Sequence, residues 1–372
     1  MVELALCFTR RLVHLCWLLA PFPALSAGLA VTHVNLDNRV LSVTHPVAPI
    51  RFTINEPASV LVKIYDARNI LVAKINAGEA LPPGEHKASW NGVSLHGDPL
   101  PPGAYSVIIE AVSSQGEKVI WDLTDSTGGE TLAPQHIAFD RKKRVIRYRL
   151  RQTGRVFIRV GIEESSVQRT IANGVVRLAG DHEEPWDGMD ASGIIDLAEH
   201  PHLQFSVDGY RLSDNTVILL NDDEYYPQQK WMAITAGNAE KRVSLPKRRG
   251  LDQHAYHSPD QCRDVHLHID FPDDLPVNEQ GLPIVSGKLP IRITARPGDA
   301  ALIESQRFEI VFFLNNQMLY ENEASYLPYT WTWNPVSITE GINYLTAFIV
   351  TFEGHFAVAN AKFVLRNSPE RL

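Results

Sequence analysis

Apolar and polar residues alternate in short runs along the chain from Val31 onwards. In the run 60–65, for example, Val60, Val62 and Ile64 fall on one side of an extended backbone. A period of two is typical of a β-strand with one buried face, and no stretch keeps the 3.6-residue period of a long amphipathic helix. We therefore expect an all-β protein made of sandwiches. The strands expected in the first part cover 31–37, 49–54, 60–65, 70–75, 87–90 and 104–111.

A tryptophan turn motif occurs twice. Trp90-Asn91-Gly92 returns 96 residues later as Trp186-Asp187-Gly188, and the strand-like runs around it return at the same spacing. A period of this length predicts a duplicated domain. We expect each tryptophan to be a buried anchor of its sandwich, followed by a tight turn that needs positive φ.

The last third of the chain predicts a third sandwich of another subtype. Its expected strands cover 265–271, 290–295, 308–314, 341–350 and 359–365, and Trp333 stands in a comparable position before a turn. The stretch 221–262 lacks this pattern and combines acidic, aromatic and basic groups. Because compact domains rarely use a connection of about 40 residues, we expect a linker or a functional insertion there.

Residues 1–27 have the pattern of a secretory signal peptide. Arg10 and Arg11 precede the apolar run 12–20, and small residues follow at 24–27. The run is short and followed by prolines, so we expect no transmembrane segment in the mature chain. The protein is therefore expected to be exported, to the periplasm or beyond the cell. Removal of the signal leaves Cys262 as the remaining cysteine, which argues against an internal disulfide.

Length and charge narrow the class of partner. The chain has 372 residues, of which 44% are hydrophobic and 21% charged, which suits two or three globular domains. Its formal net charge is −8, and nucleic acid is not an expected partner because phosphate contacts need a basic face. The basic run 241–249 is interpreted as a solvated linker, with a polyanion site as the alternative.

The first two sandwiches resemble a known Ig-like domain. The segments "PASVLVKIYD" and "GEHKASWNGVSLHGDPLPPGAYSV", with "EPWDGMDASG" in the second copy, are similar to the Ig-like domain of flagellar hook-capping, FlgD-type, proteins. The resemblance covers about residues 31–125 and, more weakly, 130–220. It implies an Ig-like fold. An export signal and two copies depart from the flagellar protein, so a role in hook assembly is not carried over.

The third sandwich contains the segments "FEIVFFLNN", "LPYTWTWNP" and "EGINYLTAFIV", within about residues 283–366. These segments resemble the Ig-like modules of secreted bacterial glycosidases and adhesins, in which such modules are generally accessory spacers or binding units. Together the resemblances imply three Ig-like β-sandwich domains in tandem. The expected boundaries are 1–27 for the signal peptide, 28–128 and 129–220 for two FlgD-type domains, 221–262 for the linker and 263–372 for the third domain.

No catalytic or cofactor motif is recognisable in the sequence. It has no HExxH zinc helix, GxSxG elbow, phosphate-binding loop or haem attachment motif, so we expect a non-enzymatic protein. The acidic pair Glu183-Glu184 is expected in a solvated turn. The oxygen-rich segment 187–192 resembles a Ca²⁺ loop but lacks the full ligand spacing, and we expect a turn there as well.

One histidine group could hold a metal ion. His266 and His268 stand two apart on an expected strand, so their imidazoles share a face, and His254, His257 and Cys262 precede them. Imidazole and thiolate ligands suit Zn²⁺ or Cu ions. The alternative is that the neighbouring apolar residues form the buried face and the histidines face solvent.

The aromatic residues Tyr225, Tyr226 and Trp231 are the expected partner-binding group, with packing against a neighbouring domain as the alternative. Two functions follow. The first is an exported, non-catalytic scaffold that binds another exported or cell-surface protein, for example by β-augmentation. The second is a carbohydrate-binding accessory protein, and a metal-binding module in the region 254–268 is a further alternative.

Overall fold

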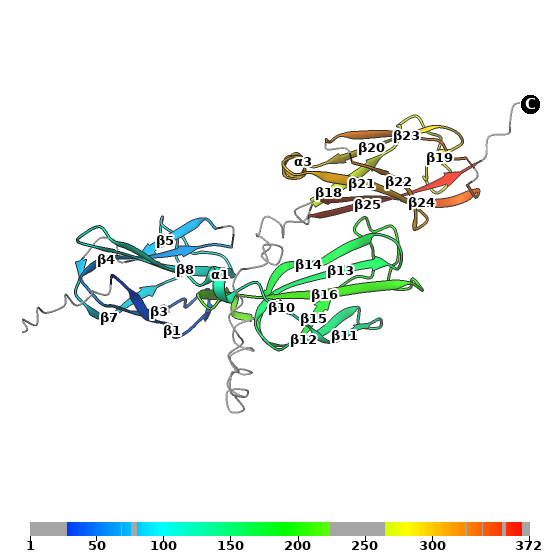
Figure 1. Cartoon of the computed structure of the whole chain (residues 1–372). Coiled ribbons are helices and arrows are strands. Elements are labelled where there is room, and N and C mark those ends of the chain that lie inside the picture. The colour runs from blue at the N-terminus through cyan, green and yellow to red at the C-terminus, as the bar shows by residue number, and fades with distance from the viewer. Residues whose placement is uncertain are drawn as a thin grey trace, which may run out of the picture.

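The computed structural model describes residues 28–67, 69–75, 80–223, 265–323, 326–336, 338–351 and 355–366. The fold is all-β, as predicted, with five sheets and two short helices among these residues. Figure 1 shows three sandwiches, which we call the first (blue to cyan), second (green) and third (yellow to red). The predicted signal peptide and linker site residues lie outside the described residues: His254, His257, Cys262, Tyr225, Tyr226 and Trp231.

The first sandwich packs a three-stranded sheet against a larger one. The small sheet has the order β1 (Val31–Leu36), β3 (Ala48–Ile54), β7 (Gly84–Trp90). The large sheet has the order β2 (Val40–Ser42), β17 (Thr216–Leu220), β8 (Gly103–Ser113), β4 (Ala58–Tyr65), β5 (Leu71–Ile75), with β6 (Ala80–Leu81) and β9 (Lys118–Trp121) beside β4 and β8. Alternate residues of β3 and β4 are buried, which confirms the expected period of two.

Strand β17 joins the first sandwich although it follows the entire second sandwich in sequence. It pairs antiparallel with β8 and parallel with β2, and all five of its residues are buried. The second sandwich is therefore inserted into the first, between β9 and β17. The final residues of the range expected for the second domain thus complete the sheet of the first.

The second sandwich repeats the arrangement of the first. Its small sheet has the order β11 (Gln135–Asp140), β12 (Val145–Leu150), β15 (Gly180–Pro185). Its larger sheet has the order β10 (Thr131–Leu132), β16 (Leu203–Arg211), β13 (Gly154–Ile162), β14 (Val167–Arg177). The contacts repeat as well, since the Nε2 atoms of His86 and His182 each lie 2.7 Å from the carbonyl oxygen four residues earlier.

The predicted tryptophan anchors are buried. Trp90, Trp186 and Trp333 expose 1%, 3% and 3% of their surfaces. Trp90 and Trp186 donate from Nε1 to the carbonyl oxygens of Val93 and Met189, three residues on, at 3.2 and 3.0 Å. Each ring thus fills its core while its N–H closes the following turn, which supports the interpretation of a fold marker.

Apolar and polar contacts join the first and second sandwiches. Val40, Ile218 and Leu220 of the first pack with Leu178 of the second. On the polar side, the Asn215 side chain ties the returning connection to the first sandwich, because it donates to the carbonyl of Val107 and to Asp122, both at 3.0 Å. The short helix α1 (Thr124–Thr127) lies in the outgoing connection, and its Thr127 hydroxyl accepts from the backbone of Asp214 at 2.8 Å. Two chain crossings and this packing hold the pair together.

The third sandwich is a sheet whose two ends meet. Its order is β22 (Gln317–Asn322), β21 (Phe308–Leu314), β24 (Gly341–Thr351), β25 (Phe356–Leu365), β18 (Val265–Asp270), β20 (Leu289–Ala295), β23 (Tyr329–Trp333), with β19 (Ile284–Val285) beside β25 and one helix, α3 (Pro297–Glu304). The rings of Tyr320 on β22 and Trp331 on β23 stack with centroids 4.6 Å apart. The two end strands thus touch through these side chains, and no backbone pairing among the described residues joins β22 to β23.

The third sandwich contacts the second directly, with β25 next to β14 in Figure 1. The buried Asn360 side chain donates to Gln168 at 2.7 Å and to Asp190 at 2.9 Å, and its backbone N–H donates to Ser192 at 2.8 Å. Gln168 and Asp190 are themselves fully buried. Because buried polar groups are costly unless paired, this cluster fixes how the two sandwiches meet.

Candidate functional site

The predicted metal-binding histidines that the structure describes face outwards from β18. Val265 and Leu267 are buried while His266 and His268 are exposed, so both imidazoles share a face as predicted. The backbone N–H of His266 donates to the buried carboxylate of Asp299 at 3.2 Å, and its Nδ1 lies 3.6 Å from the same oxygen. Within the described ranges, no three His, Cys, Asp or Glu side chains form a group able to hold a metal ion. Metal binding stays a prediction, which titration with Zn²⁺ or Cu²⁺ tests.

The acidic pair was expected in a solvated turn, and for Glu184 that expectation is wrong. Both residues lie on β15, where Glu183 is exposed beside Arg147 but Glu184 is buried. The Glu184 carboxylate accepts from Arg177 at 2.7 and 3.1 Å and from the Tyr148 hydroxyl at 2.9 Å. Arg177 and Tyr148 come from other strands, so the sequence around Glu184 does not reveal them.

The electrostatics of this cluster indicate a structural role. Burial alone opposes the charge of Glu184, but the Arg177 guanidinium and the Tyr148 hydroxyl outweigh it and lower the pKa of the carboxyl. Burial raises the pKa of Tyr148 and lowers that of His182, which stacks on the Tyr148 ring. The carboxylate is thus charged and occupied by three donors, which leaves it poorly placed to accept a proton from a substrate.

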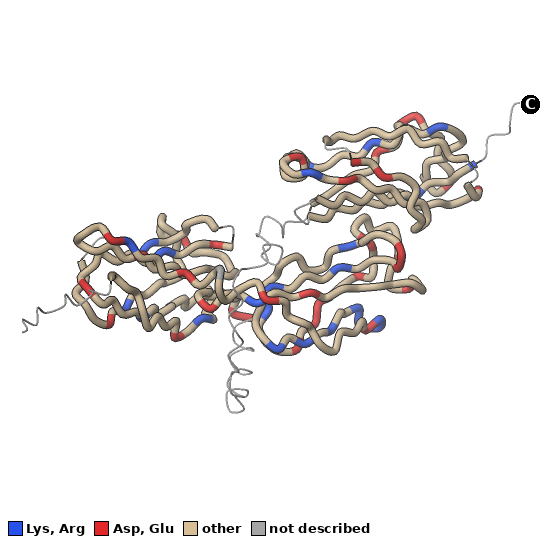
Figure 2. Tube along the Cα trace, viewed as in Figure 1, with Lys and Arg blue, Asp and Glu red and all other residues tan. Residues whose placement is uncertain are grey.

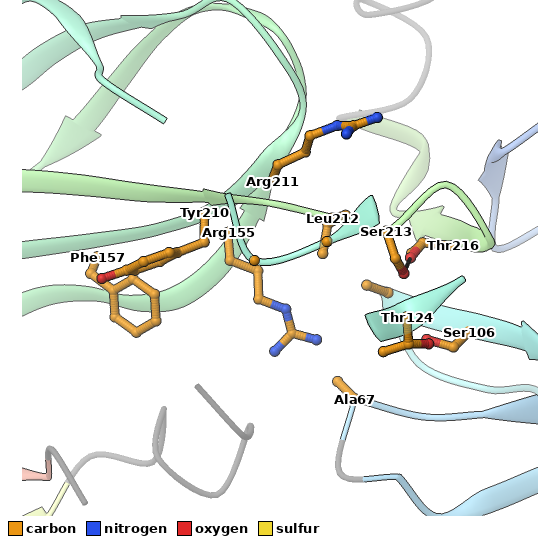
Figure 3. Close-up of a pocket in the computed structure, with 13 residues that line it drawn as sticks. Ala67, Ser106, Thr124, Arg155, Phe157, Tyr210, Arg211, Leu212, Ser213 and Thr216 are labelled. Carbon is orange, nitrogen blue, oxygen red and sulfur yellow. Dashed lines mark hydrogen bonds between the residues drawn. The ribbon is translucent and has the colours of Figure 1, made fainter. Parts of the chain in front are cut away.

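A small cavity lies at the joint between the first and second sandwiches (Figure 3). The Arg155 side chain extends toward it from β13, and the Ser213 and Thr216 hydroxyls bond to each other at 2.9 Å on its other side. Its volume is about 40 Å³. That is room for roughly three water molecules and far below the size of ordinary ligand pockets. We interpret it as part of the joint.

The expected turn at 187–192 is a turn, and it also helps to dock the third sandwich. The Asp190 carboxylate accepts from the backbone N–H groups of Ser192, Ile194 and Ile195 at 2.6 to 2.8 Å, in addition to Asn360. A carboxylate with this many N–H donors is fully used in capping the turn. The first sandwich has Ser94 at this position, where its hydroxyl accepts from two backbone N–H groups.

Most edge strands in the described part of the chain carry a feature that blocks pairing with another chain. Strands β1, β5, β11, β14 and β22 have register shifts against their neighbours. Strands β7 and β15 present charged side chains, and β2 and β10 are very short. Bulges, charges and shortness are the usual protections of an edge.

Strand β23 is an edge without these protections. Its five residues pair with β20 in an unbroken register, and its sequence, Tyr-Thr-Trp-Thr-Trp, is uncharged. Thr330 and Thr332 are exposed, while Trp331 is half-buried against Phe312, with ring centroids 4.9 Å apart. Tyr326, just before the strand, is 58% exposed and packs edge-on against Tyr329. The edge and its aromatic neighbours form a candidate docking site, which the alternation of aromatic residues in 329–333 could have indicated.

Similarity to known proteins supports the fold of the first sandwich. Residues 40–115 match the family model of the FlgD Ig-like domain, which confirms the resemblance found in the sequence. The match runs from β2 through β8. The chain therefore contains an Ig-like domain of FlgD type, a kind of domain that fits a non-catalytic scaffold. No curated protein matches the chain.

Several solved structures also align. The fibronectin(III)-like modules of Clostridium thermocellum CbhA align over 92% of this chain and 97% of their own, at 10% identity and a TM-score of 0.20. FLGD from P. aeruginosa aligns over 41% of this chain and 96% of its own, at 16% identity and a TM-score of 0.21. A bacterial ice-binding adhesin aligns over 91% and 99%, at 11% identity and a TM-score of 0.17. None of the helices among the described residues has the length and hydropathy to cross a membrane.

Proposed function

We propose that this chain is an exported, non-catalytic scaffold that binds another exported or cell-surface protein through the edge of β23. The supporting observation is that β23 is a regular, uncharged edge beside half-exposed aromatic rings. An extended segment of a partner can add to such an edge by main-chain hydrogen bonds, while Trp331 and Tyr326 provide apolar contacts at its side. The interlocked first and second sandwiches and the docked third one give the scaffold a fixed geometry.

The signal-like segment 1–27 supports export, and periplasmic and extracellular locations remain the two alternatives. The domain division 28–128, 129–220, 221–262 and 263–372 is part of the proposal, with the difference that β17 serves the first sandwich. Tyr225, Tyr226 and Trp231 remain proposed as additional partner contacts.

Affinity capture from the secreted and periplasmic fractions of the producing cell tests the scaffold. A variant with Thr330→Lys and Thr332→Lys places charges on the exposed side chains of β23, and it should lose the captured partner. A matched Ser89→Lys variant, on the exposed face of edge strand β7, should retain it. Equal capture by all three proteins, or capture of nothing, would remove the support for this site.

Carbohydrate binding is the second candidate, because Tyr326 is largely exposed next to stacked rings. Aromatic faces can stack against sugars as they do against other apolar surfaces. A glycan array with wild type and Tyr326→Ala discriminates the two functions. Strong sugar binding that is lost in the variant would favour this candidate over the scaffold.

A further inference from the structure

The second sandwich has a groove next to its buried tryptophan that the scaffold function does not use. We call it the Trp186 groove, and its volume is about 410 Å³, within the usual range for ligand pockets. It is lined by Lys143, Arg144, Arg169, Thr170, Ile171, Pro185, Trp186 and Asp187. Figure 2 shows basic residues gathered at the β11–β12 turn, which forms one side of the groove.

Three cationic side chains from two parts of the fold meet in this groove. Lys143 is exposed in the β11–β12 turn, and Arg144 ends that turn with a φ of 55°. A Cβ atom at Gly188 would lie 1.8 Å from Arg144 Nη1, so the glycine makes room for the guanidinium. Arg169, on β14, donates to the carbonyl oxygen of Asp190 at 3.0 Å. A backbone carbonyl thus holds the Arg169 guanidinium at the groove, and the missing side chain of Gly188 leaves space for that of Arg144.

The carboxylates near these arginines pair with them only loosely. Arg144 lies 3.5 Å from Asp196 and 3.9 Å from Glu199, and Arg169 lies 3.5 Å from Asp187. On the same sandwich, Arg147 and Arg177 reach their glutamates at 2.7 Å. Short, charge-assisted bonds are the strong ones, so a well-placed oxyanion can take guanidinium donors from these longer pairs.

The carboxylate inside the groove is itself held by the backbone. Asp187 Oδ1 accepts from the N–H of Met189 at 2.9 Å. Lys143 lies beside Asp140, whose Oδ1 accepts from the Lys143 backbone N–H at 3.1 Å. The lining residues thus include three cations and one carboxylate, while Asp196 and Glu199 lie beside Arg144 outside the lining.

The first sandwich provides an internal comparison, because it has the same fold without the cations. In the strand register, Arg169 lies opposite Val160, and Ala73 lies opposite Ile64 in the first sandwich, so Ala73 is the equivalent of Arg169. At the same spacing of 96, Val47 and Ala48 stand in place of Lys143 and Arg144. Gly92 of the first sandwich corresponds to Gly188, and Pro46 fills the space that the Arg144 guanidinium takes in the second. A Cβ atom at Gly92 would lie 2.6 Å from the Cβ atom of Pro46. The Ig-like framework thus folds without these cations, so folding alone does not account for them.

We propose that the Trp186 groove binds the oxyanion of a phosphate- or sulfate-bearing ligand, a function beyond the protein scaffold. Arg144 and Arg169 donate to its oxygens from the two sides of the groove, and Lys143 contributes charge at the mouth. The planar guanidinium forks suit the bidentate geometry of such groups. Thr170 and Ile171 line the rest of the groove, where the remainder of the ligand lies.

Isothermal titration of the mature chain with inorganic phosphate and with inorganic sulfate, at constant ionic strength, tests this site. Wild type should bind, and the Arg144→Gln/Arg169→Gln variant should bind at least about tenfold more weakly. Arg149→Gln is the matched control, since Arg149 is an exposed arginine of the same sandwich outside the groove and 3.7 Å from Asp181. It should bind like wild type.

A second variant distinguishes a loss of binding from a loss of folding. Lys143→Gln changes an exposed turn residue and should weaken binding several-fold while leaving the circular dichroism spectrum unchanged. Sedimentation with phosphatidylcholine vesicles that contain phosphatidylglycerol distinguishes a lipid headgroup from a soluble ligand. Anion binding without vesicle binding identifies a soluble ligand, whereas binding to both identifies the headgroup. No binding by wild type, or equal binding by all variants, overturns the proposal.

Discussion

Arg177 Nε lies 2.7 Å from Glu184 Oε1 inside the second sandwich, at positions that Leu81 and Ala88 occupy in the first. Tyr148, the third member of the cluster, likewise corresponds to Phe52. One framework thus contains both a buried ionic cluster and its apolar counterpart. Because desolvation offsets much of the attraction in a buried pair, the two versions need not differ greatly in stability.

The first prediction follows from this correspondence. Glu184→Ala alone removes the carboxylate that accepts from the half-buried Arg177 and from the Tyr148 hydroxyl, and it should lower the free energy of unfolding by about 1–3 kcal/mol. The triple variant Arg177→Leu, Glu184→Ala, Tyr148→Phe reproduces the apolar version and should be near wild type or more stable. Chemical denaturation of the three proteins measures both values. A triple variant as unstable as the single one would contradict the prediction.

The second prediction concerns pH. Burial lowers the pKa of His182 below its ordinary value of 6.5, so the unfolded chain binds a proton more readily than the folded one. The stability that depends on the neutral imidazole is complete above about pH 6.5 and is lost as the pH falls through the lower folded pKa. The melting temperature of wild type should therefore fall more steeply below pH 6.5 than that of His182→Gln. Equal slopes of melting temperature against pH for wild type and His182→Gln would refute this assignment.

The third prediction concerns the contact between the second and third sandwiches. Asn360→Ala leaves the buried Gln168 and Asp190 each short of one donor, at a cost of about 1–3 kcal/mol per group. The interface should loosen, and the radius of gyration from small-angle X-ray scattering should rise. The control Asn322→Ala removes an asparagine that bonds to Tyr320, away from the interface. Unchanged scattering in Asn360→Ala would show that other contacts hold the sandwiches together.

The fourth prediction concerns the tryptophan anchors. Trp90→Ala and Trp186→Ala should each destabilise the protein by about 3–5 kcal/mol, because each ring is buried in its core. Replacement by Phe should cost less, since most of the apolar contact remains. Denaturant unfolding measures these losses, and a near-neutral alanine variant would exclude the anchor role.

The alternation of residues predicted the strands well where one face is buried. In β3 and β4 the burial pattern follows the sequence pattern residue by residue. The alternation did not predict strand β17, because the run Thr216–Leu220 is buried on both faces. Its partner β8 also lies more than 100 residues earlier in the chain. Periodicity reports which face is buried and says nothing about a distant partner.

The candidate sites were harder to predict because they depend on residues brought together from separate strands. Glu184 looked solvated, and only Arg177 and Tyr148 make its burial possible. The Trp186 groove joins the β11–β12 turn to β14, which no local motif indicates. The predicted metal and aromatic groups fall mainly in 224–264, outside the described residues.

The late position of β17 sets the order in which the protein can be completed. As the chain leaves the ribosome, β2 and β8 are made first, but the strand between them arrives only after the whole second sandwich. Until then the Gly103–Ser106 part of β8, beyond the part that pairs with β9, presents an open edge, which favours association with other chains. The first sandwich therefore cannot be completed before the second has emerged. A nascent chain that stops near residue 210 should depend on chaperones in a way that one reaching residue 220 does not.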